Sequence, residues 1–158
     1  MARALLVGCG CRGRMLGGAL IADGWAVRGT TRGVALAAIE AAGIEPAEAD
    51  PDRLGTVTDQ IGDVTVLAWL MGAADAEING PRLESLLEKL VDSPVRGLLY
   101  EARGAAGEAV LEAGAERVAA WGERFRVPVA IVRAEPGDPA AWVEEARAAI
   151  NALIGAGR

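Results

Sequence analysis

Short apolar runs alternate with longer mixed stretches along the whole chain. Six of these runs predict β-strands, at residues 3–7, 26–30, 44–49, 64–70, 95–100 and 129–133. Most of them are continuously apolar, which is the pattern of strands that are covered by helices on both faces of a sheet. The stretches between them predict helices at 12–23, 33–42, 77–92, 107–124 and 138–154, with a shorter helical turn near 52–60.

Residues that start or stop helices support these boundaries. Asp23-Gly24, Gly43 and Ser93-Pro94 predict the ends of three helices, and Asp138-Pro139 predicts a capped start for the last one. In the helix predicted at 77–92, one apolar stripe at helical spacing predicts the buried face. The stripe consists of Leu83, Leu86, Leu87, Leu90 and Val91.

The alternation of strands and helices predicts the architecture. Because crossovers between parallel strands are right-handed, this order of elements gives an α/β fold with a doubly wound parallel sheet and helices on both faces. Six strands complete the two halves of a Rossmann fold, whose usual strand order is 3-2-1-4-5-6. The sequence shows no repeat, linker or low-complexity segment, so we expect residues 1–158 to form a single domain.

Composition narrows the class of protein. No apolar run approaches the roughly 20 residues that span a bilayer. An apolar run follows Arg3, but Arg12 and Arg14 interrupt it before a signal peptide is complete, so we expect a cytoplasmic protein with no membrane partner. Two cysteines, Cys9 and Cys11, and no histidine predict neither a disulfide framework nor a metal site.

Charge is distributed unevenly along the chain. The net charge of −6 argues against a nucleic-acid partner. Residues 1–35, however, carry five arginines against Asp23 alone, whereas the remainder is strongly acidic. The chain has a single lysine, which explains why its cations are arginines but not why they cluster. The cluster predicts a local anion site near the N-terminus.

A glycine-rich turn joins the first predicted strand to the first predicted helix. Gly8, Gly10 and Gly13 form a G-x-G-x-x-G motif whose intervening residues are Cys9, Cys11 and Arg12. The first glycine permits a tight turn, the second lets the backbone approach a pyrophosphate, and the third lets the helix pack closely on the strand. The helix start offers free N–H groups to the phosphates. In this strand–helix–strand context, the motif predicts dinucleotide binding, with the two cysteines as small residues that fill the turn.

The end of the second predicted strand indicates which dinucleotide is bound. A site for NAD usually has an acidic residue there, which accepts hydrogen bonds from the ribose 2′-hydroxyl. This chain instead has Thr30, Thr31 and Arg32, and its next acidic residue is Glu40. Two hydroxyls and a guanidinium suit a 2′-phosphate, which Arg12 could approach from the other side. The sequence therefore favours NADP over NAD.

In these segments the sequence resembles the short-chain dehydrogenase/reductase superfamily, in particular its NAD-dependent epimerase/dehydratase-like and NmrA-like branches. The segments that resemble it are Val7–Arg14, Val27–Arg32, Asp50-Pro51, Asp63–Ala68 and Pro128–Gly137. The resemblance implies that Asp50 contacts adenine and that the end of the fourth strand runs beneath the cofactor ribose. We therefore include Ala68 in the site, with Trp69 near the nicotinamide. It also implies a chain limited to the Rossmann domain.

The chain departs from this family in its catalytic residues. Family enzymes use a Tyr-x-x-x-Lys pair on the helix after the fifth strand, and the corresponding stretch here, residues 109–117, has neither residue. The single tyrosine, Tyr100, ends the fifth predicted strand and has Gly104 four residues later. Without a neighbouring Lys or His it would keep a pKa near 10. We expect a half-buried Tyr100 with its hydroxyl in the cleft, and we assign no catalytic residue.

Three functions remain open at this point. The first is a small NADP-dependent oxidoreductase- or epimerase-like enzyme. Its site for an unidentified small molecule would be completed by the loop at 71–80 or by a partner chain, for which a homo-oligomer is one arrangement. The second is a non-catalytic module that senses the NADP/NADPH ratio, as the resemblance to NmrA-like proteins suggests. The third is a structural Rossmann protein with an empty cleft.

Overall fold

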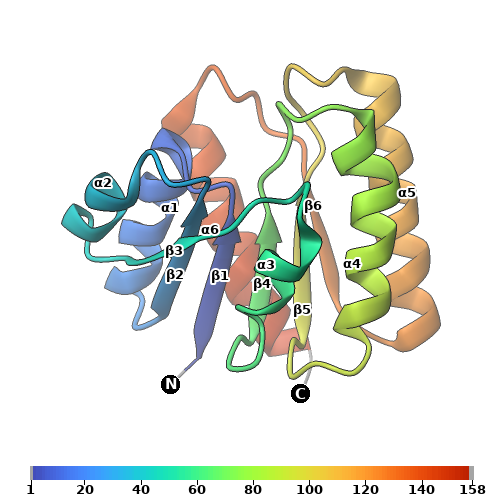
Figure 1. The fold of residues 1–158 in the computed structure, drawn as a ribbon, viewed down its shortest axis with the longest axis horizontal. Coiled ribbons are helices and arrows are strands. Elements are labelled where there is room, and N and C mark those ends of the chain that lie inside the picture. Colours follow the sequence, from blue (N-terminus) through green and yellow to red (C-terminus); the bar gives the residue numbers. More distant parts are fainter. Residues whose placement is uncertain (1, 157–158) are drawn as a thin grey trace.

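A computed structural model describes residues 2–156 and contains one parallel sheet of six strands in the order β3-β2-β1-β4-β5-β6 (Figure 1). The strands are β1 (Arg3–Val7), β2 (Ala26–Thr31), β3 (Glu45–Glu48), β4 (Val66–Trp69), β5 (Gly97–Glu101) and β6 (Val129–Val132). The helices are α1 (Cys11–Ala22), α2 (Leu36–Ala41), α3 (Leu54–Thr58), α4 (Leu83–Leu90), α5 (Glu108–Phe125) and α6 (Pro139–Ala156). The predicted fold class and strand order are confirmed.

The helix predicted at 77–92 differs from the expectation. Its first part is a π-helical turn, η1 (Ile78–Arg82), which contains Pro81, and α4 follows it. A proline removes a backbone donor and disturbs the hydrogen bonds of the preceding turn, which accounts for the change of helix type. The four leucines of the predicted stripe are buried, but Val91, which follows the end of α4, is 42% exposed.

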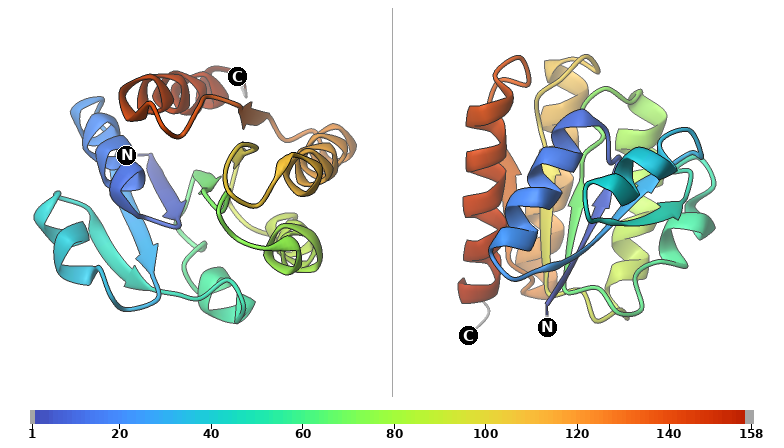
Figure 2. Two further views of the ribbon diagram at one scale, coloured as in Figure 1. Left: turned by 90° about the horizontal axis from the view of Figure 1, so that it is seen from above. Right: turned by 90° about the vertical axis from the view of Figure 1, so that its left-hand side faces the viewer.

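Each face of the sheet has its own hydrophobic core. Helices α1, α2 and α6 cover one face, and α3, α4 and α5 cover the other (Figure 2). Alternate residues of β1 supply both cores: Ala4 and Leu6 face the first, and Leu5 and Val7 face the second. All four side chains are fully buried. This explains why the strands appear as continuous apolar runs in the sequence.

Helices α1 and α6 are held together by a polar cluster on the first face. The Arg147 guanidinium donates two hydrogen bonds to the Asp23 carboxylate, and the side-chain amide of Asn151 donates a third at 2.9 Å. The Trp25 indole N–H donates to the Asn151 side-chain oxygen at 2.9 Å. The hydrogen bonds from Arg147 and Asn151 lower the pKa of Asp23 to about 2. The carboxyl-terminal end of α1, opposite the glycine motif, is thus anchored to α6, whose Arg147 lies 124 residues away from Asp23.

Helix α5 passes directly over the side chain of Tyr100 in β5. A Cβ atom added at Gly114 would overlap the Tyr100 ring and hydroxyl. Tyr100 is fully buried beneath the helix. The close approach of α5 to the sheet therefore depends on a glycine at this position.

We predict that Gly114→Ala destabilises the protein by about 1–3 kcal/mol, because the added methyl group must displace a buried aromatic side chain. The measurement is the free energy of unfolding in urea. The control is Gly18→Ala in α1, where an added Cβ meets nothing within 4 Å. That control is expected to be neutral or to stabilise by up to about 1 kcal/mol. Equal free energies of unfolding for the two variants would contradict the described packing of α5 on Tyr100.

Candidate functional site

The candidate site is a cleft at the carboxyl ends of the strands, where the strand order reverses between β1 and β4. Its larger part is a cavity of about 460 Å³ lined by Gly8, Cys9, Gly10, Arg12, Thr30, Thr31, Arg32, Val34, Ala35, Ala49, Pro51, Leu70 and Met71. A smaller cavity of about 140 Å³ adjoins it and is lined by Gly8, Gly10, Cys11, Arg12, Gly13, Leu70, Glu101 and Trp142. A groove of about 590 Å³ between α4 and α5 is larger but lies away from the glycine motif.

The three glycines of the motif differ in what prevents a side chain. Gly8 has φ 94°, and a Cβ there would overlap Met71 and the Leu70 carbonyl. A Cβ at Gly13 would lie 3.3 Å from the Gly8 carbonyl oxygen, so the close packing of helix and loop disfavours a side chain there. A Cβ at Gly10 would meet nothing within 4 Å. The protein itself therefore accounts for Gly8 and Gly13, but it leaves open space at Gly10.

The start of α1 offers unpaired donors next to that open space. Gly10 is the N-cap residue, and its carbonyl accepts the N–H of Arg14 at 2.8 Å. Within residues 2–156, the backbone N–H groups of Cys11, Arg12 and Gly13 donate to no protein acceptor. Free N–H groups at a helix start, together with the helix dipole, bind anions. Open space above Gly10 and free donors beside it fit the diphosphate of a dinucleotide.

Thr30 and Thr31 have different roles in the structure. Thr30 is buried: its hydroxyl accepts the Gly8 N–H at 3.2 Å, and its carbonyl accepts the Cys9 N–H at 2.9 Å. The residue therefore shapes the glycine turn. The Thr31 hydroxyl accepts the Ala35 N–H at 3.4 Å in a half-buried position. Both residues line the larger cavity, but only Thr31 exposes part of its side chain.

Arg32 and Asp50 lie together at the outer rim of the larger cavity. The Arg32 side chain is 60% exposed, with Nε 3.5 Å from an Asp50 carboxylate oxygen. Its Nη2 atom is 4.0 Å from a carboxylate oxygen of Asp52, a residue that the sequence reasoning did not include. Exposed ion pairs of this kind contribute little to stability, with a median of about 0–1 kcal/mol. Arg32 is therefore free to exchange these partners for a ligand.

The end of β4 differs from the prediction. The side chains of Ala68 and Trp69 are fully buried on opposite faces of the sheet, so they do not line the cleft. The next two residues, Leu70 and Met71, line it instead. The physical reason is the alternation of side chains along a strand, which turns the indole of Trp69 into the core beneath α3, α4 and α5.

The two cysteines occupy different environments. Cys9 is buried against Gly29 and Gly13, and burial raises the pKa of its thiol to about 11. Cys11 is exposed, and neither cysteine is part of a disulfide. Among residues 2–156, no group of three or more His, Cys, Asp or Glu side chains is arranged to hold a metal ion.

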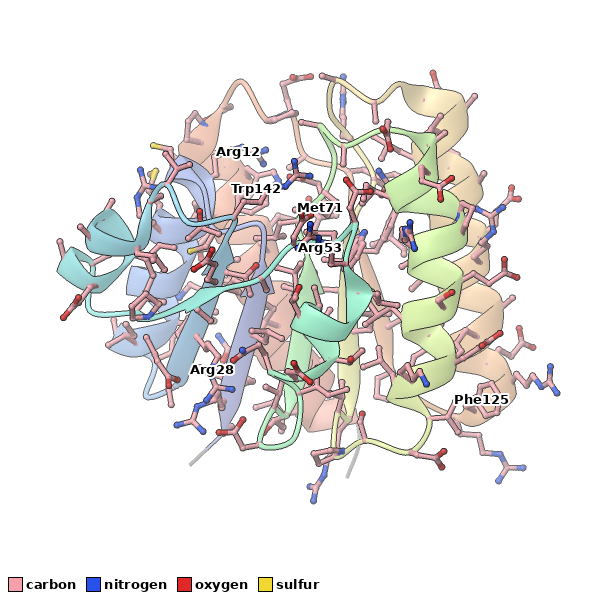
Figure 3. The ribbon with its side chains drawn as sticks, viewed as in Figure 1. Arg12, Arg28, Arg53, Met71, Phe125 and Trp142 are labelled. Carbon is pink, nitrogen blue, oxygen red and sulfur yellow. The ribbon has the colours of Figure 1, made fainter. Side chains whose placement is uncertain are left out.

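Arg12 points away from the Arg32 end of the cleft. Its Nη1 atom donates to a carboxylate oxygen of Glu101 at 2.5 Å, and its guanidinium carbon lies 4.5 Å from the centre of the Trp142 ring. Figure 3 shows Arg12 and Trp142 side by side near the upper end of the sheet. The expected approach of Arg12 to a 2′-phosphate is therefore wrong for this conformation, because the buried Glu101 carboxylate holds the guanidinium.

Two of the five N-terminal arginines lie far from the cleft. Arg28 donates to Glu45 and Asp63, and Arg3 also pairs with Asp63. Asp63 precedes β4, at the amino-terminal edge of the sheet, and Figure 3 shows Arg28 at the opposite end of the molecule from Arg12. Only part of the predicted arginine cluster therefore lies at the cleft, because Arg3 begins β1 and both Arg3 and Arg28 pair with Asp63 at the amino-terminal edge of the sheet.

Tyr100 is not in the cleft. Its hydroxyl donates to the side-chain oxygen of Asn79 at 3.0 Å, beneath α5, and burial raises the pKa of the phenol to about 12. The Asn79 amide nitrogen donates to the carbonyls of Met71 and Ala74. The expectation of a half-buried tyrosine with its hydroxyl in the cleft is wrong. This hydroxyl instead fixes the turn that carries Met71.

The fold is shared with solved enzyme structures. The chain resembles UDP-glucuronic acid 4-epimerase from Bacillus cereus in complex with NAD (16% identity, TM-score 0.66, 83% of this chain and 55% of that chain). It also resembles UDP-glucose 4-epimerase with UDP-glucose from Thermotoga maritima (13% identity, TM-score 0.70, 83% of this chain and 54% of that chain). A third similar structure is that of a short-chain dehydrogenase/reductase superfamily protein from Agrobacterium tumefaciens with bound NAD (18% identity, TM-score 0.66, 83% of this chain and 48% of that chain).

These similarities concern the fold. The chain spans about half the length of each of these proteins, and at such identities the likeness shows the fold alone. The predicted resemblance to epimerases and other short-chain dehydrogenase/reductase proteins is thus confirmed at the level of the fold. No family model and no curated protein sequence matches the chain. None of the helices within residues 2–156 has the length and apolar character of a membrane span.

We predict that Gly10→Val abolishes dinucleotide binding and leaves the fold intact. The added side chain meets no protein atom but fills the space that a diphosphate needs. Binding is measured by calorimetry with NADPH, and folding by the thermal unfolding midpoint. Gly62→Val is the control, because it too has open space and lies before β4 at the far edge of the sheet. Full affinity in Gly10→Val would mean that the ligand lies elsewhere.

Proposed function

We propose that this chain is a dinucleotide-binding Rossmann protein whose cofactor is NADP(H). The observation that carries the proposal is the empty space above Gly10, beside the free N–H groups of Cys11, Arg12 and Gly13. Nothing inside the protein requires a glycine at position 10, whereas an approaching diphosphate does. The enzymes of similar fold that hold NAD support the same class of ligand.

In this proposal the cofactor extends across the whole cleft. Its adenosine half occupies the larger cavity between Thr31, Arg32 and Pro51, and its diphosphate crosses Gly10. Leu70 and Met71 line the wall of the cavity formed by the end of β4. A bound nicotinamide supplies hydride transfer, and the chain's own residues bind and orient it.

The preference for the phosphorylated cofactor depends on the rim of the larger cavity. Residues 30–32 include no carboxylate that could accept a hydrogen bond from a ribose 2′-hydroxyl. Thr31 and Arg32 instead offer hydrogen-bond donors to a phosphate. A 2′-phosphate must compete with Asp50 and Asp52 for Arg32, but those pairs are long and exposed. A forked guanidinium–phosphate contact is the stronger interaction.

We expect the purified protein to bind NADPH more tightly than NADH. One charge-assisted contact of about 1.5–3 kcal/mol corresponds to roughly tenfold to over a hundredfold in affinity. Calorimetry with both nucleotides measures the ratio, and Arg32→Ala should remove most of it. Arg124→Ala, which removes the same charge on α5, should leave the ratio unchanged. Equal or tighter binding of NADH by the wild-type protein would overturn the NADP assignment.

Two functions are compatible with such a site. One is a small oxidoreductase- or epimerase-like enzyme whose substrate site includes the loop at 71–80 or a partner chain. The other is a non-catalytic sensor of the NADP/NADPH ratio. The burial of Tyr100, whose pKa is raised to about 12, favours the sensor, because a general acid or base works best with a pKa near the working pH.

Any NADPH oxidation by this protein should depend only weakly on Tyr100. Tyr100→Phe is expected to change the rate less than about tenfold, whereas loss of a true acid–base residue costs about 10²–10⁴-fold. The assay follows NADPH absorbance with a panel of aldehydes, ketones and quinones. A thousandfold loss of rate with unchanged cofactor affinity would identify Tyr100 as a catalyst and favour the enzyme. Binding without oxidation of NADPH by any member of the panel would favour the sensor.

A further inference from the structure

Three side chains from distant parts of the chain meet beside the smaller cavity. Glu101, at the end of β5, is 1% exposed. One of its carboxylate oxygens accepts from Arg12, in the first turn of α1, and the other accepts the Gly72 N–H at 2.8 Å. Trp142, in the first turn of α6, provides the ring on which the Arg12 guanidinium lies. Figure 3 shows the Arg12 and Trp142 side chains at this end of the sheet.

This arrangement fixes the Arg12 guanidinium in place. A buried carboxylate is strongly unfavourable without a counter-charge, so Glu101 retains Arg12 as its partner. The stacking on Trp142 sets the plane of the guanidinium. Arg12 thus does not move to the Arg32 end of the cleft, where it would leave the carboxylate uncompensated.

The guanidinium still has donors to offer a ligand. Only its Nη1 atom donates within residues 2–156, which leaves the Nε and Nη2 groups without a protein acceptor. The side chain is 27% exposed, and it lines both the larger and the smaller cavity. Arg14, two residues later, lines neither cavity. Arg12 is therefore the cation at the junction of the two cavities, beside Gly10.

We propose that Arg12 binds the diphosphate of the nucleotide in this cleft, so that a nucleoside diphosphate is the unit that the site recognises. A planar guanidinium with two free donor groups matches two phosphate oxygens. Helix α1 adds its own N–H groups on the neighbouring side. This inference rests on the proposed function, since it assumes that a nucleotide lies across Gly10, and it adds the residue that distinguishes a diphosphate from a monophosphate.

The test compares ADP with 5′-AMP by calorimetry on the full chain. Removing Arg12 alone would leave a buried charge and risk misfolding, so the principal variant is Arg12→Met combined with Glu101→Gln. In that variant the glutamine side-chain oxygen still accepts the Gly72 N–H. We expect wild-type protein to prefer ADP, and the double variant to lose roughly tenfold or more of that preference. Its affinity for 5′-AMP should change less than about threefold.

Two single variants show whether the loss of the preference for ADP is due to Arg12. Arg14→Met removes one positive charge from the same turn of α1 and should keep the wild-type ratio of ADP to AMP affinity. Glu101→Gln keeps the guanidinium on Trp142 and should also retain the preference for ADP. If Glu101→Gln lost as much of the preference for ADP over 5′-AMP as the double variant, the assignment to Arg12 would be overturned. Thermal unfolding midpoints confirm that each variant is folded.

The outcomes separate this inference from the proposed function. If wild-type protein binds neither ADP nor NADPH, the dinucleotide site itself is wrong. If wild-type protein prefers ADP and the folded double variant keeps that preference, Arg12 does not bind the diphosphate, while the dinucleotide site stands.

Discussion

The turn from β1 into α1 has no room for a side chain at Gly8, and the rest of the cleft is arranged around this turn. Gly8 lies between the Leu70 carbonyl and the Met71 side chain, while Thr30 accepts hydrogen bonds from Gly8 and Cys9. Because β1 pairs with β2 on one side and β4 on the other, these contacts tie the turn to both neighbouring strands. The start of α1 is thereby aimed across the point where strand order reverses, which is where open α/β sheets bind ligands.

A second constraint comes from the buried carboxylate of Glu101. An isolated buried charge is so costly that it must be paired or neutralised. The Arg12 guanidinium and the Gly72 N–H compensate it, and in doing so they link α1, β5 and the turn after β4. The pairing of Arg147 with Asp23 holds α1 to α6 at its other end. The walls of the cleft are therefore held by contacts that join α1, β5, α6 and the turn after β4.

The sequence predicted the elements well because its signals for them are local. Continuous apolar runs, glycine stops and the Asp138-Pro139 start each depend on a few adjacent residues, and the Asp138 carboxylate does accept the Ala141 N–H. The mechanical reasons for Gly8 and Gly13 could also be predicted, since they depend only on the turn from strand to helix. The glycine motif is the part of the site for which sequence and structure agree most closely.

Placement of individual side chains was harder to predict. An apolar run does not show where its strand ends, so Leu70 and Met71 line the cleft where Ala68 and Trp69 were expected. The pairing of Arg12 with Glu101 joins residues 89 positions apart, and no local pattern indicates it. The same burial that removes Tyr100 from the cleft gives its hydroxyl a structural partner in Asn79. Glu101 is paired with Arg12 and Tyr100 with Asn79, so both polar groups at the end of β5 hold the walls of the cleft in place. In the proposed function, these walls position a bound nucleotide, and the groups that touch it are the glycine turn, the start of α1 and the rim at Thr31 and Arg32.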